Sequence, residues 1–325
     1  MRDFIQYRLP NVSTIVAQSG QFELLPNGKI PAGFVVSDFL HQRLYQFQVD
    51  SSINDDQQWH IDAKQPVVIS QRDYQIEAQA LLNGFSMLQV EKAVYSRVKA
   101  VSFPIESAQQ LFDQLEKTYP NAFVYLISSN YFGTWIGATP ETLIETNDQH
   151  LKTIALAGTQ RSGETTEWSQ KDQEEHAFVV KAIEENLKRN NCKELSINGP
   201  HLRLAGPVQH LQTNFDAQLG AVPAWNIAMD LHPTPAVCGT PRMAALDLIS
   251  SREMHDRFLY AGIIGLYSAE KSHLFVNLRC AQLQQEKAYL YLGGGFTSDS
   301  IPDLEWEETE NKSRTLLNCI DRVTK

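Results

Sequence analysis

Several features that mark other protein classes are missing from this chain. The four cysteines, Cys192, Cys238, Cys280 and Cys319, stand far apart and form no Cys-x-x-Cys pair. We therefore expect reduced thiols in an intracellular protein and no disulfide framework. The N-terminus has no signal-peptide core, and no apolar run approaches membrane-spanning length. Both absences predict a cytoplasmic protein without a membrane partner.

Positive charge is also scarce. The chain has 28 lysines and arginines against 38 acidic residues, a formal net charge of −10. This balance argues against a general nucleic-acid binder, and it means that an anionic substrate would need a local cationic site. The sequence has no internal repeat, no low-complexity segment and no dense histidine and aspartate cluster of the kind that metal-dependent hydrolases use.

The composition is that of an ordinary globular protein, with 42% hydrophobic and 20% charged residues. A length of 325 residues exceeds the typical domain, but large α/β enzymes of this length also form one unit. We expect a single catalytic domain over residues 1–325, with a β-rich N-terminal part over 1–85 and a catalytic core over 86–325.

In the N-terminal part, short apolar runs alternate with turn residues. Asn27-Gly28 predicts a hairpin turn, and residues 33–36 and 67–69 predict strands. Residues 51–58 predict a polar loop, and nothing in this part suggests chemistry.

Two polar residues lie in apolar surroundings near the middle of the chain. Lys92 lies on one face of a predicted strand over residues 90–97, where a solvated surface lysine is the simpler interpretation. Glu141 follows a Gly/Pro turn after two strands predicted over residues 123–136. Such a glutamate can be half-buried, which raises its pKa, or can lie in water. Between the two, residues 107–119 predict an amphipathic helix.

Near the C-terminus, three glycines from Gly293 on follow a β-rich run. Ser300 is suited to cap the helix that comes next, and Pro302 suits its first turn. A glycine triplet before a helix is weak evidence for an anion cradle. At helical spacing Glu308 shares a stripe with Ile301, Leu304 and Lys312, and Glu305 lies one turn before it.

A second carboxylate lies on the inward face of a helix predicted over residues 169–189. The apolar stripe of this helix is Val179, Val180, Ile183 and Leu187. Extended backwards by four residues, it reaches Glu175. A carboxylate on an inward face is costly unless a cation meets it, and for Glu308 that cation is Lys312 or a metal. Two such glutamates favour a Mg²⁺ site with oxygen ligands, although solvated acidic faces that suit the helix dipole explain each one singly.

The remaining segments alternate predicted strands and helices. Strands are predicted over residues 151–159, 202–208, 227–231, 260–267 and 274–284, a proline-rich loop over 232–242, and a helix over 243–249. Arg279 falls inside the last strand. A buried arginine needs a partner, and a substrate carboxylate is one candidate; an outward-facing arginine is the alternative.

Together these segments resemble the chorismate-utilising enzymes, and among them most closely the isochorismate synthases. The resemblance depends on the order and spacing of pieces spread over about two thirds of the chain. The pieces lie at residues 91–97, 137–141, 157–159, 171–176, 231–236, 260–262, 278–281 and 293–312.

The resemblance implies an α/β (α+β) sandwich with a large, mainly antiparallel sheet core and helices outside. It implies that Lys92 is the general base and Glu141 the general acid, and that Mg²⁺ is the cofactor. The implied metal ligands are Glu175 and Glu308, with Glu305 nearby. The implied substrate-binding residues are Gly158, Thr159, His232, Tyr260, Arg279, Gly293 and Lys312.

The implied activity is isochorismate synthase, an isomerase that adds water at C2 of chorismate and expels the C4 hydroxyl, for menaquinone or siderophore biosynthesis. Water is a weak nucleophile and hydroxide a poor leaving group, so a base and an acid are both needed. The pKa of Lys92 would have to fall from ~10.4 toward roughly 7–8, and that of Glu141 to rise toward roughly 6–7.

Two alternatives stay open at this point. A salicylate synthase would follow the same first step with elimination of pyruvate, although the loop from His232 to Ala236 is similar to the isochorismate synthase form. A non-catalytic, Mg²⁺-dependent chorismate-binding protein would keep the fold without turnover. We expect a monomer with chorismate as its only partner and no glutaminase subunit.

Overall fold

The computed structural model describes residues 2–50, 59–62, 64–161, 163, 167–205 and 208–324. The polar loop predicted over residues 51–58 lies outside these ranges. In the described part every strand pairs antiparallel with its neighbours, in the order β10-β11-β9-β8-β14-β13-β3-β4-β2-β1-β6-β7-β15-β16-β5-β12. The predicted fold class is therefore confirmed.

The strands are β1 (Asp3–Arg8), β2 (Ile15–Leu24), β3 (Gly33–Ser37), β4 (Leu44–Val49), β5 (Lys92–Ser102), β6 (Phe123–Ser129), β7 (Gly133–Thr139), β8 (Thr142–Asn147), β9 (His150–Arg161), β10 (Lys193–Ala205), β11 (Val208–Gln218), β12 (Gly239–Thr240), β13 (Ile263–Tyr267), β14 (Lys271–Val276), β15 (Cys280–Gln284) and β16 (Lys287–Phe296). The helices are α1 (Gln71–Leu88), a 3₁₀ turn (Ile105–Ser107), α2 (Ala108–Thr118), α3 (Gln170–Arg189), α4 (Ala224–Leu231), α5 (Arg242–Ser250) and α6 (Pro302–Val323).

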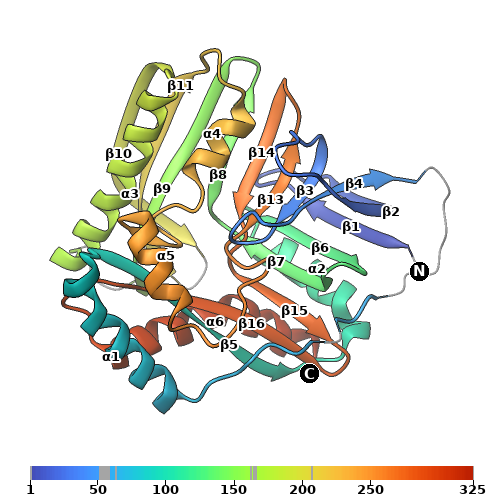
Figure 1. The fold of residues 1–325 in the computed structure, drawn as a ribbon. Coiled ribbons are helices and arrows are strands. Elements are labelled where there is room, and N and C mark those ends of the chain that lie inside the picture. Colours follow the sequence, from blue (N-terminus) through green and yellow to red (C-terminus); the bar gives the residue numbers. More distant parts are fainter. Residues whose placement is uncertain are drawn as a thin grey trace.

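The sheet bends around a large apolar core, and the helices cover it from outside. Figure 1 shows β8 to β11 with α3 on one side, the N-terminal strands on the other, and β5, β15 and β16 with α6 below. The larger core cluster includes buried residues of α1, α3, α4 and α5, and a second cluster fills the space beneath α2 and α6. No described helix is both long enough and apolar enough to cross a membrane.

Local sequence signals explain where several helices begin. The hydroxyl of Ser70 accepts a hydrogen bond from the backbone N–H of Asp73 at the start of α1, and Ser169 does the same with Asp172 at α3. Pro302 occupies the first turn of α6, as predicted, but Ile301 is the cap residue. Ser300 instead accepts from the N–H of Thr297, so its predicted role as the cap is wrong.

Four predicted segments differ from the structure. Residues 67–69 form no strand. Residues 71–88, placed in the β-rich part, form helix α1, whose buried face is Tyr74, Ala78, Leu81 and Phe85. Residues 227–231 belong to helix α4 (Ala224–Leu231), whose exposed polar residues Asn226 and Asp230 lie one turn apart; the predicted range began after Asn226 and so missed this helical spacing. The strand predicted over residues 274–284 is broken between β14 and β15.

We expect the centre of the larger core to dominate stability. The ring of Phe123 is fully buried and stacks on Phe275, with centroids 4.4 Å apart and an angle of 6° between the planes. Phe123→Ala should lower the free energy of unfolding by about 3–5 kcal/mol, because it removes buried apolar surface and leaves a cavity. Urea titration followed by circular dichroism measures the loss.

Met87→Ala on α1 is the control, since its side chain is 83% exposed. It should change stability by less than about 0.5 kcal/mol. Equal effects of the two substitutions would contradict this account of the core.

Candidate active site

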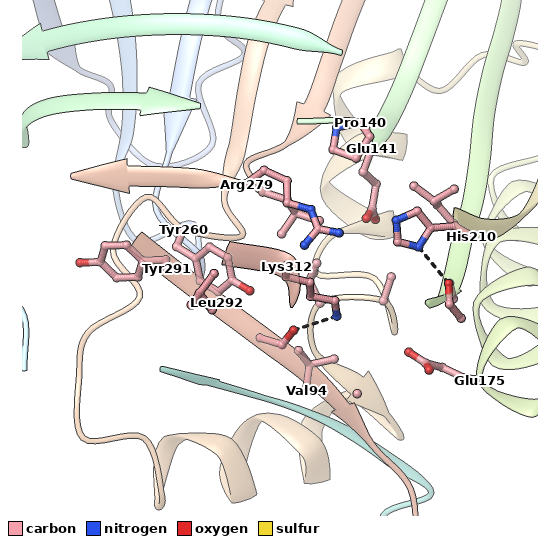
Figure 2. Close-up of a pocket in the computed structure, with 18 residues that line it drawn as sticks. Val94, Pro140, Glu141, Glu175, His210, Tyr260, Arg279, Tyr291, Leu292 and Lys312 are labelled. Carbon is pink, nitrogen blue, oxygen red and sulfur yellow. Dashed lines mark hydrogen bonds between the residues drawn. The ribbon is translucent and has the colours of Figure 1, made fainter. Parts of the chain in front are cut away.

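A pocket forms where β16, β5, β9 and the segments that follow β7 and β14 meet (Figure 2). It collects residues that are far apart in the sequence. Of the predicted site residues, those that line it are Glu141, Gly158, Glu175, Tyr260, Arg279, Gly293 and Lys312. The structure thus brings most of the predicted set together, although their individual roles stay predictions.

One wall of the pocket is the glycine end of β16. The three glycines are part of the strand and pair with Ser96, Tyr95 and Val94 of β5, so they form no cradle at a helix N-terminus. A Cβ on Gly293 would lie 2.6 Å from Oη of Tyr260, and one on Gly295 would lie 2.5 Å from Oε1 of Glu175. Glycine is required here because other side chains already occupy the space above the strand.

Lys92 lies directly beside this wall. Its side chain is fully buried on β5, and its Nζ lies 2.8 Å from Oε1 of Glu175. A Cβ on Gly295 would come within 3.3 Å of Cε of Lys92. The alternative of a solvated surface lysine is therefore wrong, and Lys92 must leave its ion pair before it can act as a free amine.

Glu141 enters the pocket from the turn between β7 and β8. Its backbone carbonyl accepts a hydrogen bond from the N–H of Val276, which fixes the turn, and its carboxyl group points into the pocket (Figure 2). Burial raises the pKa of Glu141 to about 7, even though the charges of Lys92, Arg279 and Lys312 act to lower it. The alternative of a turn glutamate in water is wrong, since only 5% of the residue is exposed.

Two cations face the pocket. Arg279 lies in the break between β14 and β15 with φ +50, a conformation that is uncommon for a residue other than glycine. No described carboxylate lies within ion-pair distance of its guanidinium. Lys312 on α6 donates to the carbonyl oxygen of Gly293 at 2.9 Å and pairs with Glu308 at 2.5 Å. The pocket therefore offers Arg279 to an anionic ligand without a competing carboxylate.

The carboxylates at the start of α6 are balanced by lysines. Glu305 is only 2% exposed on its side chain and forms an ion pair with Lys171 of α3. Burial, and next to it the charge of Glu308, raise the pKa of Glu305. Burial acts to raise the pKa of Glu308 as well, but the ammonium groups of Lys312 and Lys171 outweigh it, so that pKa is lowered.

The carboxylate oxygens of Glu175, Glu305 and Glu308 are the type of ligand that a hard divalent cation prefers. Oε2 of Glu305 is buried and makes no hydrogen bond to any described residue. An orphaned carboxylate oxygen beside other carboxylates suits Mg²⁺. Among the described residues, however, no three acidic, histidine or cysteine side chains gather closely enough to form a ready-made metal centre. The assignment of Glu175, Glu305 and Glu308 to a metal stays a prediction.

Two predicted substrate-binding residues need comment. His232 does not line the pocket; its ring packs against His41 with centroids 4.4 Å apart, and its Nε2 lies 3.3 Å from the carbonyl oxygen of Phe39. Its role as a substrate contact stays a prediction, and the structure shows only that the ring packs on His41. The side chain of Thr159 lies outside the described part of the chain.

The predicted stripe on α6 is also corrected. Ile301 is 54% and Leu304 is 56% exposed, whereas Glu305 is buried. The inward face of α6 is therefore turned toward Glu305 and away from the two apolar residues, although Glu308 and Lys312 do meet at the pocket.

Sequence reasoning missed His210 and Lys171. His210 on β11 lines the pocket, and its Nδ1 lies 2.9 Å from the carbonyl oxygen of Gly158 (Figure 2). Burial, with the charge of Arg279 next, lowers the pKa of His210 to about 3, so its imidazole is neutral. No local sequence pattern marks His210. Lys171 lies four residues before Glu175 on the same predicted helix, and this spacing predicts that the two side chains are neighbours.

A buried ion pair supports the pocket from behind. Arg257 donates to the carbonyl oxygens of Val94 at 2.5 Å and Val237 at 2.7 Å, and both of these residues line the pocket. Its counter-ion, Glu253, also accepts from the N–H and the hydroxyl of Ser96. The pair joins β5 to the proline-rich loop, which fixes two walls of the pocket relative to each other.

The chain is similar to known proteins over most of its length. A family model described as chorismate binding enzyme matches residues 8–321. The isochorismate synthase EntC of Escherichia coli K12 is 32% identical over 244 residues, which is 71% of this chain and 62% of that protein. The vibriobactin-specific isochorismate synthase of Vibrio cholerae is 32% identical over 263 residues, 76% of this chain and 66% of that protein. The matches thus span less than two thirds of these relatives.

Solved structures support the fold. DhbC from Bacillus anthracis has a TM-score of 0.81 at 24% identity and covers 98% of this chain and 95% of its own. MenF, the menaquinone-specific isochorismate synthase from Escherichia coli, has a TM-score of 0.80 at 20% identity, with 98% and 89% covered.

The raised pKa of Glu141 predicts a pH-dependent stability. Its carboxyl group is protonated in the folded chain up to about pH 7 but ionises near pH 4.5 when unfolded. Stability should therefore fall as pH rises from 4.5 through 7, by on the order of 3 kcal/mol from this group. Glutamine does not ionise, so Glu141→Gln removes this pH-dependent fall. The stability of the variant relative to the unmodified chain should therefore increase as the pH rises from 4.5 to 7.

Urea midpoints measured at several pH values between 4 and 8.5 give the difference. Glu145→Gln is the matched control, because Glu145 is exposed on β8. A Glu141→Gln difference that stays constant over this range would contradict a protonated Glu141.

Proposed function

This chain belongs to the family of chorismate-binding enzymes, and on that premise we propose that it is an isochorismate synthase. The observation that carries the proposal is the position of Glu141, a buried carboxyl group with a pKa of about 7, in one pocket with Arg279 and beside Lys92. Curated relatives that bear the name isochorismate synthase add support.

Lys92 and Glu141 divide the proton transfers. Lys92 takes a proton from the water that attacks C2, and Glu141 gives a proton to the C4 hydroxyl, which leaves as water. The ring double bonds shift, and one water enters for each that leaves, so the reaction is an isomerisation. A carboxyl group with a pKa of about 7 is still substantially protonated at neutral pH and can act as the acid.

The cations and the tyrosine of the pocket hold the dianionic substrate. Arg279, which has no carboxylate partner among the described residues, receives one carboxylate, and its planar fork suits two parallel hydrogen bonds. Lys312 and Tyr260 lie on the same side of the pocket and bind the rest of the anion (Figure 2). The neutral ring of His210 and the β9 backbone at Gly158 close the opposite side.

Glu175, Glu305 and Glu308 would hold Mg²⁺. When bound, the ion supplies a positive charge that offsets the substrate's carboxylates and the local acidic residues. The support for this assignment is the buried, orphaned Oε2 of Glu305 among the described residues. The isochorismate formed would enter menaquinone or siderophore biosynthesis, since related proteins are named for each.

Incubation of the purified protein with chorismate and Mg²⁺ tests the reaction, with the products identified by mass spectrometry. We expect isochorismate. Salicylate together with pyruvate would instead identify a salicylate synthase, and binding of chorismate without any product would identify a non-catalytic protein.

Removal of the base should abolish turnover. Lys92→Gln should lower kcat by 10²–10⁴-fold, roughly the contribution of a positioned general base. Lys152→Gln, which changes a lysine whose side chain is 62% exposed, should stay within about twofold of the unmodified enzyme. Circular dichroism checks that both variants fold. Near-normal kcat in Lys92→Gln would exclude Lys92 as the base.

The metal is tested by binding as well as by activity. Exhaustive EDTA treatment should remove activity, and added Mg²⁺ should restore it. In calorimetric titrations Glu308→Gln should weaken Mg²⁺ binding at least about tenfold, whereas Glu307→Gln, at an exposed position of the same helix, should not. Full activity after EDTA would reject the cofactor.

A further inference from the structure

A second pocket adjoins the first, and we call it the outer pocket. It lies between the end of α2, the tip of β10 and α6, and it shares Pro140 and Arg279 with the active-site pocket. Much of its lining is apolar, from Leu204, Ala138 and Pro140 and from the segment around Tyr119.

The outer pocket is cationic in an acidic protein. Its lining includes Arg203 and Arg279 and no acidic side chain. In the part of the chain that the structure describes, neither guanidinium lies within ion-pair distance of a carboxylate. Two guanidinium groups that share one pocket without an acidic lining residue give it a local positive charge in a chain of net charge −10, and this charge suits an anion.

The wall of the outer pocket is firmly built. Arg8, only 2% exposed, donates from below to the carbonyl oxygens of Tyr119, Pro120 and Ala122. The hydroxyl of Tyr119 in turn donates to the carbonyl oxygen of Thr315 on α6. The pocket is therefore held in shape without a ligand, which lowers the cost of binding one.

Arg279 connects the two pockets. Its charge acts on the carboxyl group of Glu141 in the active-site pocket and on the phenol of Tyr119 in the outer pocket. A ligand carboxylate in the outer pocket can therefore use Arg203 and share Arg279 with the active site.

We propose that the outer pocket is a second binding site for a small cyclic carboxylate, whose anionic group lies between Arg203 and Arg279 and whose ring lies against Leu204 and Pro140. Two sources supply such a ligand. One is the substrate or product of the proposed reaction on its way through the enzyme; the other is a different cyclic carboxylate that acts as an inhibitor. The site itself does not depend on the proposed function, but the first source does.

A fluorine NMR titration with 4-fluorobenzoate tests the site. The unmodified chain should bind 4-fluorobenzoate, and the Kd of this binding should rise at least about tenfold in Arg203→Gln because a charge-assisted hydrogen bond is lost. Arg72→Gln removes the same charge from an exposed position at the start of α1 and should leave the titration unchanged. Arg203 lines the outer pocket and not the active-site pocket, so any binding in the active-site pocket is retained. Identical titrations of the two variants would overturn the proposal.

Kinetics with chorismate distinguish the sources. For a ligand in transit, Arg203→Gln should lower kcat/KM at least about threefold with kcat unchanged. For a separate inhibitor, benzoate should lower kcat of the unmodified enzyme, and Arg203→Gln should remove that inhibition without changing KM. A chain that binds 4-fluorobenzoate through Arg203 but does not turn over chorismate would overturn the proposed reaction and keep the anion site.

Discussion

This site depends on the close approach of polar side chains to the backbone of strand β16, which is possible because three consecutive residues of the strand are glycines. Over Gly293–Gly295 the strand β16 leaves room for the hydroxyl of Tyr260 and the carboxylate of Glu175 at distances that a single Cβ would forbid. Lys92 reaches the same space from β5, which pairs with β16 residue by residue. The fold therefore places an amine and a carboxylate against bare backbone, where water has little access.

Because these charged side chains are buried close together, their charges have to be balanced by nearby partners. Burial favours the neutral form of a carboxyl group, so a buried glutamate is stabilised by a nearby cation. Three glutamates of the site have a lysine partner: Glu175 with Lys92, Glu305 with Lys171, and Glu308 with Lys312. Glu141 has no such ion pair among the described residues, and its raised pKa is the result. Arg279 has no ion pair among the described residues either, and its side chain lines the pocket.

The order of the motifs along the chain identified residues that the fold brings close together, although their roles stay predictions. Lys92, Glu141 and Glu175 were each ambiguous from their own segment, yet all three meet in one region. The same reasoning failed where a side chain's direction depends on packing. The stripe through Leu304 was assigned inward, but helix α6 rotates Glu305 into the interior.

By itself the sequence determined the fold class, most of the strands and the set of polar residues worth examining, because hydrophobic period, caps and motif order are local or ordered along the chain. Only the tertiary structure decided which charges pair, which carboxyl group stays protonated and how His210 and Arg257 support the pocket. Most of those properties depend on distances between separate segments, such as His210 and Gly158, 52 residues apart, or Arg257 and Val94, 163 residues apart. They also depend on how completely water is excluded between the segments, which no single stretch of the chain encodes.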